Sequence, residues 1–260
     1  GEFKVFGIDF MDFVKDEARL ALTSGQVFLN LSVYYSSINI LRRFNPQDVL
    51  YPFENRSWEK MVILATRAVS HDIQLVGYQH SSLTPKHVNF YLGDGEWKEI
   101  PFPDAIITMG HITKDLMVDS FNFPRDRVKV GCALRQSLPE WLDTKNHNKI
   151  KRILVVLASS IDEYVKMLQF LDKAFSFSKG YSLTIRPHPL IDFRKALRLY
   201  DPKGLQYEID KGILNESLKA SDLVLYASSS VSLEAISMGI PVICIGLRDV
   251  LDTDPLFNMS

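Results

Sequence analysis

Short apolar runs alternate with amphipathic segments along the chain, a pattern that predicts strands alternating with helices. In the first half it predicts strands at 48–52, 74–78, 105–109 and 127–132. Helical periodicity covers 10–23, 31–44 and 57–70. A polar, turn-rich insertion at 83–103 separates the second strand from the third. Strands that alternate with helices in this way indicate a parallel α/β unit.

The second half repeats the pattern with five predicted strands, at 153–157, 181–185, 205–209, 223–226 and 241–245. The helices predicted between and after them lie at 162–175, 191–199, 213–220 and 231–238. A polar, aperiodic segment at 143–151 has the character of a linker. We therefore expect an α/β protein with two Rossmann-like domains, 1–147 and 148–260, that face a cleft. Ligands would then bind at the carboxyl ends of the strands.

Composition narrows the class of protein. Hydrophobic residues make up 46% and charged residues 23% of the chain, which is typical of a globular protein. A formal net charge of −1 argues against a nucleic-acid partner, because such proteins carry a basic excess. The two cysteines, Cys132 and Cys244, indicate neither a disulfide framework nor a metal cluster and suit a reduced, cytoplasmic setting.

Targeting and membrane signals are weak in this sequence. No apolar run reaches the roughly 20 residues needed to span a bilayer, and the start lacks a signal-peptide pattern. The opening Gly1-Glu2-Phe3 has the character of a cloning remnant, and the chain stops soon after its last predicted strand. We therefore expect a fragment of a larger protein.

The strongest candidate site combines two loops of the second half. Arg186 and His188, in an Arg-Pro-His-Pro run, follow one predicted strand. The serines Ser228, Ser229 and Ser230 stand between another strand and a helix. Hydroxyl groups and free N–H groups at a helix N-terminus favour anions, so together these residues suggest a phosphate site. Alternatively, the prolines only end a strand and one serine only caps a helix.

Further polar residues follow other predicted strands or lie in the next helix. Glu54 would accept a proton from a substrate hydroxyl; alternatively, Glu54 or Asn55 only caps the following helix. His80 would contact substrate or act as a base, or be structural. Glu234 would accept from ribose hydroxyls or complement the helix dipole.

The loop after the first strand of the second half adds three candidates. Ser159 and Ser160 would reach the same phosphate or the sugar, and Asp162 would contribute a carboxylate or serve as a helix cap. The sequence contains no HExxH, CxxC, Walker or GxGxxG motif. Zinc hydrolysis, ATP hydrolysis and NAD chemistry therefore lack their signatures, and no metal site or cofactor is expected.

The phrases RPHP (186–189) and YASSSVSLEAISMGIPVI (226–243) resemble the His-Pro and Ser-Ser motifs of GT-B glycosyltransferases that use CMP-activated sugars. Those families include bacterial polysialyltransferases and Kdo transferases. YPFENRSWEK (51–60) and GYQHSS (77–82) resemble bacterial surface-carbohydrate biosynthesis proteins. The resemblance implies a GT-B-like fold, here truncated, because the first half has few strands and the closing C-terminal helices are absent.

The same resemblance implies a metal-independent transfer of a Kdo-type or sialic-acid-type sugar from a CMP-activated donor. The acceptor would be a surface polysaccharide or lipopolysaccharide. His188 would bind the donor phosphate together with Ser228 and Ser229. Glu54 would be the base of an inverting enzyme, and Asp162 the nucleophile of a retaining one.

Three alternatives stay open at this point. The chain would be a CDP-glycerol glycerophosphotransferase, a UDP-sugar enzyme such as a GT-B epimerase or hexosyltransferase, or a non-catalytic GT-B-like scaffold. For an enzyme, the partners would be a nucleotide-sugar donor and a glycan or glycolipid acceptor. A cytoplasmic location is expected, and peripheral association with the inner membrane is left open.

Overall fold

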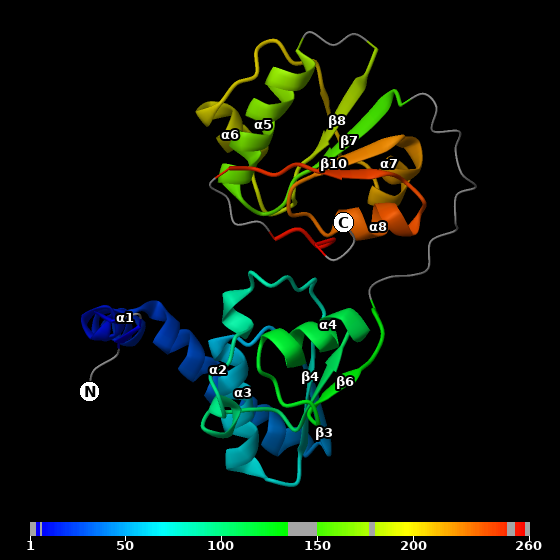
Figure 1. Cartoon of the computed structure of the whole chain (residues 1–260). Helices are drawn as coiled ribbons and strands as arrows, with labels where there is room; N and C mark the ends of the chain where they lie inside the picture. Colours follow the sequence, from blue (N-terminus) through cyan, green and yellow to red (C-terminus); the bar gives the residue numbers. More distant parts are fainter. Residues whose placement is uncertain (1–3, 6, 135–149, 177–179, 249–252, 258–260) are drawn as a thin grey trace. The chain divides into compact units, whose positions relative to one another are not determined.

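The computed structural model describes residues 4–5, 7–134, 150–176, 180–248 and 253–257 (Figure 1). The chain forms two compact units. The first comprises Gly1–Ser81 and Asn89–Ala133, and the second Ser82–Val88 and Leu134–Ser260. The predicted boundary at 147/148 and most of the predicted linker lie outside the described residues.

The first unit contains a four-stranded parallel sheet, as the alternating pattern predicts. Its order is β3 (Asp48–Pro52), β4 (Gln74–Tyr78), β5 (Ala105–Thr108) and β6 (Val128–Val130). A short antiparallel pair, β1 (Lys4–Val5) and β2 (Ile8–Asp9), precedes the first helix. All four predicted strands of the sheet are therefore confirmed, with small shifts at their ends.

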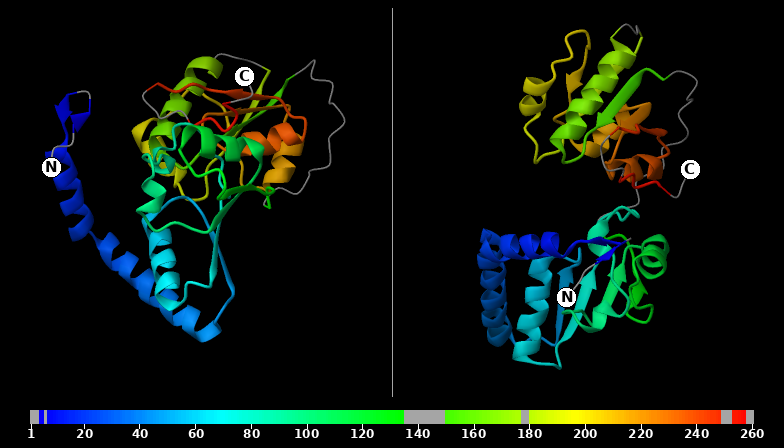
Figure 2. Two further views of the ribbon diagram at one scale, coloured as in Figure 1. Left: turned by 60° about the horizontal axis from the view of Figure 1, so that its bottom comes forward. Right: turned by 60° about the vertical axis from the view of Figure 1, so that its left-hand side comes forward.

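Three helices accompany this sheet in the sequence: α1 (Met11–Thr23), α2 (Gly25–Phe44) and α3 (Ser57–Val69). Helix α2 begins six residues before the predicted start at residue 31, because Ser24 caps it by accepting from the Gln26 N–H at 3.3 Å. It ends at Asn45, whose φ of 43° is left-handed. Helices α2 and α3 lie side by side (Figure 2), and Leu41 and Ala65 join them in one apolar cluster.

The segment after β5 differs from the prediction. Helix α4 (His111–Asp115) and a π-helical turn (Leu116–Ser120) occupy a stretch for which no element was predicted. The buried residues of this stretch, Thr113, Leu116, Met117 and Phe121, have the i, i+3, i+4, i+8 spacing of one helical face. The turn-rich segment at 83–103 is confirmed in its loops and 3₁₀ turns, although it also buries Phe90 and Leu92.

The second unit contains a five-stranded parallel sheet in the order β11-β10-β7-β8-β9. The strands are β7 (Arg152–Val156), β8 (Ser182–Arg186), β9 (Glu208–Ile209), β10 (Leu223–Tyr226) and β11 (Val242–Cys244). The predicted strand at 205–209 is reduced to its last two residues. Strand β7 therefore lies at the centre, between β10 and β8.

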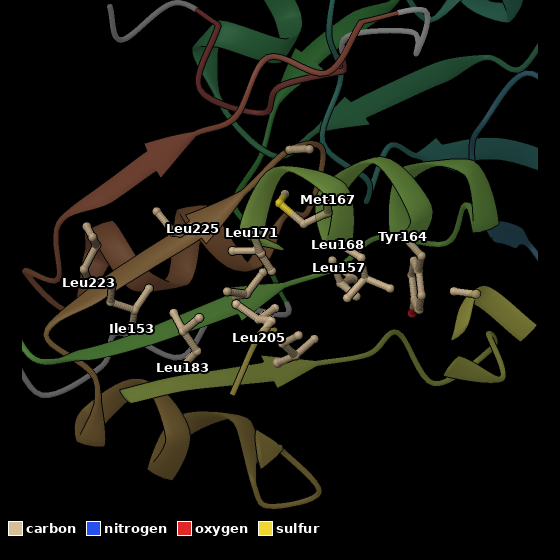
Figure 3. Close-up of a cluster of buried hydrophobic side chains, with 14 residues drawn as sticks. Ile153, Leu157, Tyr164, Met167, Leu168, Leu171, Leu183, Leu205, Leu223 and Leu225 are labelled. Carbon is tan, nitrogen blue, oxygen red and sulfur yellow. The ribbon is translucent and has the colours of Figure 1, made fainter. Parts of the chain in front are cut away.

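Helices cover both faces of this sheet (Figure 1). One face carries α5 (Ile161–Phe175) and α6 (Phe193–Leu199), and the other carries α7 (Leu214–Ala220) and α8 (Val231–Ser237). Ile153 and Val155 of β7 enter the cluster beneath α5 (Figure 3), whereas Leu154 and Val156 enter the cluster on the other face. Because both faces of the sheet are buried at β7 and β10, these two strands are nearly continuous apolar runs in the sequence.

The sequence predicts no membrane-spanning segment. Among the helices that the structure describes, none combines the length and apolar character needed to cross a bilayer.

Candidate functional site

The loops of the proposed phosphate site follow three neighbouring strands of the second unit. Ser159 and Ser160 follow β7, His188 follows β8, and Ser228 follows β10. Because these strands are parallel and adjacent, their carboxyl ends lie along one edge of the sheet. The structure thus places the predicted motifs on neighbouring loops of a single unit.

Glu163 connects two of these loops and was missed by the sequence reasoning. Its Oε1 accepts from the Ala158 N–H at 2.9 Å, and its Oε2 accepts from the Ser228 hydroxyl. The residue is only 1% exposed. The spacing Ser160-x-x-Glu163 is a capping-box pattern, the one signal that marks this glutamate in the sequence.

The interpretation of Asp162 as the helix cap is wrong. The N-cap of α5 is Ser160, whose Oγ accepts from the Glu163 N–H at 3.4 Å. Asp162 lies in the first turn with an exposed side chain, because a hydroxyl two residues earlier already satisfies the free donor. Ser159 is also exposed, so it and Asp162 remain free of the packing that holds Glu163.

The backbone of the His188 loop is hydrogen-bonded to a buried tyrosine. The His188 N–H donates to the Tyr164 hydroxyl at 2.5 Å, and the His188 Nδ1 accepts from the Leu190 N–H at 3.3 Å. Burial raises the pKa of Tyr164, partly offset by this backbone contact. The imidazole is half-buried at the edge of the sheet.

Arg186 is held by another residue of the same unit. Its Nη1 contacts Asp210 Oδ2 at 2.5 Å and donates to the Gly212 carbonyl at 3.1 Å. Burial acts to raise the pKa of Asp210, but hydrogen bonds from Ser217, Gly212 and Arg186 keep it below its ordinary value. Arg186 therefore has a protein partner for its charge, and its role toward a ligand stays a prediction.

Glu234 lies within electrostatic reach of Arg186. Burial raises the pKa of this half-buried carboxyl group, and the positive charge of Arg186 opposes the rise. Both predicted roles for Glu234, with ribose hydroxyls and with the helix dipole, stay predictions.

The three serines have different surroundings. Ser228 is tied to Glu163, and Ser229 is buried, with its Oγ accepting from the Val231 N–H at 3.4 Å. Ser230 occupies the N-cap position of α8, is exposed and makes no side-chain capping bond. The capping interpretation therefore fits Ser229 better than Ser230, and Ser230 presents its hydroxyl to solvent.

In the first unit, the structure brings Glu54 and His80 together. They follow the adjacent parallel strands β3 and β4, and Glu54 Oε1 lies 3.6 Å from His80 Nε2. Arg56 Nε lies 3.7 Å from the other carboxylate oxygen. Within the described residues, the buried Nδ1 of His80 has no hydrogen-bond partner. Two residues considered separately in the sequence thus form one acid–base pair.

The loop that carries Glu54 is tightly supported. Asn89 Nδ2 donates to the Glu54 carbonyl at 2.8 Å, and Asn55 Nδ2 donates to the Asn89 carbonyl at 2.7 Å. Lys60 Nζ donates to Asn55 Oδ1 at 2.7 Å. Asn55 has a φ of 56°, a left-handed conformation that these contacts maintain. Such a loop presents the Glu54 carboxylate in a fixed place.

Glu59 is hydrogen-bonded to the backbone of the same loop. The sequence alone did not identify this residue either. Its Oε1 accepts from the Glu54 N–H at 2.9 Å, and the residue is 1% exposed. Burial raises its pKa to about 7, while N–H groups of the loop oppose the rise. The interpretation of Glu54 or Asn55 as the cap of α3 is wrong, because Arg56 holds the N-cap position and no side chain caps it.

Glu59 and Glu163 are equivalent in their local structure. Each is the third residue of the helix after a strand, and each accepts from the N–H of the residue five positions earlier. In the second unit the other oxygen takes the Ser228 hydroxyl. Among the described residues, the corresponding Glu59 Oε2 has no hydrogen-bond partner. Only Glu163 therefore joins its loop to a neighbouring one.

The described residues contain no group of three or more His, Cys, Asp or Glu side chains that could hold a metal ion.

No family model matches this chain, and no curated protein matches it. Its structure is similar to that of a putative UDP-N-acetylglucosamine 2-epimerase from Listeria monocytogenes, with a TM-score of 0.55 and 15% identity over 86% of this chain. It is equally similar to the UDP-GlcNAc 2-epimerase from Neisseria meningitidis bound to UDP-GlcNAc, with a TM-score of 0.55 and 15% identity over 85% of the chain.

A third similar structure is the lipopolysaccharide outer core galactosyltransferase WaaB, with a TM-score of 0.51 and 15% identity over 85% of the chain. The chain spans 63% of the Listeria protein and 64% of each of the other two. These similarities confirm the predicted fold class, two Rossmann-like α/β domains of GT-B type in a chain shorter than its neighbours. The predicted use of a CMP-activated sugar stays a prediction.

Proposed function

We propose that this protein is a GT-B-type enzyme that binds a nucleotide-sugar and transfers the sugar to a glycan or glycolipid acceptor. The observation that carries the proposal is the arrangement of the His188 and Ser228 loops on one sheet edge, where they follow the two strands that flank β7. That edge is the usual ligand position in open α/β sheets. The similar Neisseria enzyme is described as bound to UDP-GlcNAc, which supports a nucleotide-sugar as the ligand class.

For the donor we propose a CMP-activated sugar of the Kdo or sialic-acid type. Its support is the resemblance of residues 186–189 and 226–243 to the motifs of CMP-sugar enzymes. A UDP-sugar enzyme is the second candidate, because the similar epimerases are named for UDP-GlcNAc. The acceptor would be a surface polysaccharide or lipopolysaccharide.

In the proposed reaction, His188 and the serine loop hold the donor phosphate. The bond between the sugar and the phosphate oxygen breaks, and the nucleotide leaves with the electron pair. Donors aimed at the phosphate stabilise this growing negative charge without a metal ion. The acceptor oxygen forms the new bond to the sugar, and its proton passes to the Glu54 carboxylate. Asp162 would be the nucleophile if the enzyme instead retains configuration.

Calorimetric titration with CMP, UDP and CDP-glycerol tests the donor assignment. We expect CMP to bind and His188→Ala to weaken binding roughly 10- to 100-fold, the effect of losing a hydrogen bond to a charged group. His71→Ala, which removes an exposed histidine of the first unit, is the matched control and leaves binding unchanged.

The other results point to the alternatives. Binding of UDP but not CMP favours a UDP-sugar enzyme, and tight binding of CDP-glycerol favours a glycerophosphotransferase. If the folded protein binds no nucleotide, the proposal is wrong and a scaffold role replaces it. Transfer assays with CMP-Kdo and CMP-sialic acid then separate the two sugars.

A further inference from the structure

The first turn of α5 contacts two different loops through two consecutive residues. Glu163 and Tyr164 are 1% and 0% exposed, so neither side chain is available for direct contact with a ligand. Glu163 reaches the Ser228 loop, and Tyr164 reaches the His188 loop. One short piece of backbone therefore supports both loops that carry the proposed phosphate-binding residues.

The contacts of Glu163 restrain the loop after β10. A buried carboxylate is costly unless both oxygens are hydrogen-bonded, and here each oxygen has one donor, the Ala158 N–H or the Ser228 hydroxyl. Because the Ser228 proton is directed at Glu163, the side-chain rotamer of Ser228 is set from inside the protein. The oxygen of Ser228 and the neighbouring backbone then keep one orientation.

The contact of Tyr164 restrains the loop after β8. Pro187 and Pro189 have no N–H group, so the N–H of His188 is the sole backbone donor of this tripeptide. It donates to the Tyr164 hydroxyl at 2.5 Å. The Tyr164 ring packs against Phe193 with centroids 5.9 Å apart, which keeps the hydroxyl in place.

We infer that Glu163 and Tyr164 are positioning residues that set the placement of Ser228 relative to His188 for a nucleotide phosphate. This inference rests on the proposed function and deepens it. Neither residue touches the ligand. Each acts through a loop residue, so its effect depends on the partner that it holds.

Two substitutions test the inference in the intact chain. Tyr164→Phe removes one oxygen and keeps the ring, and we expect the Kd for CMP, or for UDP if that is the ligand, to rise about fivefold. Glu163→Gln keeps an acceptor for Ala158 but replaces the charged acceptor of Ser228, and we expect a rise of about tenfold or more.

A matched control removes a tyrosine hydroxyl that contacts the same helix away from the loops; this tyrosine, Tyr200, follows α6. The Tyr200 hydroxyl donates to Asp172 Oδ2, also on α5, at 2.6 Å. Tyr200→Phe therefore removes one tyrosine hydroxyl and one half-buried hydrogen bond to α5, and we expect its Kd to match that of the wild type. Thermal denaturation of each variant shows whether it is folded.

A second measurement separates positioning from general stability. If Glu163 acts through Ser228, Glu163→Gln adds little to the loss of affinity already caused by Ser228→Ala. Should Glu163→Gln fail to fold, Tyr164→Phe and Ser228→Ala still test the two loops.

The outcomes distinguish this inference from the function on which it rests. A wild-type protein that binds no nucleotide overturns the proposed function, and the inference with it. Wild-type binding with unchanged Kd in both variants overturns only the positioning role. An equal loss of affinity in Tyr200→Phe and Tyr164→Phe also overturns it, because the effect would then come from stability alone.

Discussion

The buried carboxyl group of Glu59 makes the stability of the first unit depend on pH. Burial raises its pKa from the ordinary 4.5 to about 7, against the opposing effect of the loop N–H groups. The folded state therefore binds this proton more tightly than the unfolded state. Its stabilising contribution is complete below about pH 4.5 and is lost as the pH rises through about 7.

The magnitude follows from the two pKa values. The difference between 4.5 and about 7 corresponds to about 3 kcal/mol of unfolding free energy. Glu59→Gln keeps an oxygen that can accept from the Glu54 N–H but never becomes charged. We therefore expect the stability of this variant relative to the wild type to rise by up to about 3 kcal/mol between pH 4.5 and pH 8.

Urea denaturation followed by tryptophan fluorescence measures this difference. Trp58 and Trp97 lie in the first unit, and Trp141, outside the described residues, is replaced by Phe in every protein compared. Glu17→Gln, at an exposed position of α1, is the control and is expected to follow the wild type at each pH. Parallel stability curves for Glu59→Gln and the wild type would refute the reasoning, since Glu59 would then titrate normally.

Two further predictions concern packing and an ion pair. A Cβ at Gly77 would lie 2.9 Å from Cδ2 of the buried Phe53. We therefore expect Gly77→Ala to lower the unfolding free energy of the first unit, measured by urea denaturation, by about 1–3 kcal/mol. Gly25→Ala is the control and is expected not to destabilise the unit, because a Cβ at Gly25 would have open space around it. The hydrogen bond from Arg152 lowers the pKa of Asp222, so the stability that this carboxylate contributes is present above its ordinary pKa of 3.8 and is lost as the pH falls. Asp222→Asn should therefore lower the melting temperature at pH 7 and lower it less at pH 3, and a constant gap would contradict this linkage.

Much of the fold could be predicted because parallel strands buried on both faces leave a local signal. The bounds of β3, β4 and β10 coincide with the predicted ranges, and β10 is an uninterrupted apolar run buried on both faces. Helix α4 left only a weak signal, since it has five residues and passes directly into a π-helical turn. The buried residues of the helix and turn, Thr113, Leu116, Met117 and Phe121, do have helical spacing, but they span barely more than two turns and one of them is polar.

The candidate site was predictable in part for the same reason. Glu54, His80, His188 and Ser228 follow predicted strands, so a strand pattern is enough to bring them to a sheet edge. Glu59 and Glu163 carried no comparable signal, because a glutamate in a first helical turn usually remains at the surface. Their burial depends on which loop lies above the helix.

The order of strands and helices, and the side chains that end each strand, follow from the residue pattern because neighbouring residues determine periodicity. Side-chain partners follow from folding instead. Ser228 meets Glu163 only because β10 pairs with β7, and Glu54 meets His80 only because β3 pairs with β4. Such contacts join residues far apart in the chain, and no local pattern encodes them until the sheet has formed.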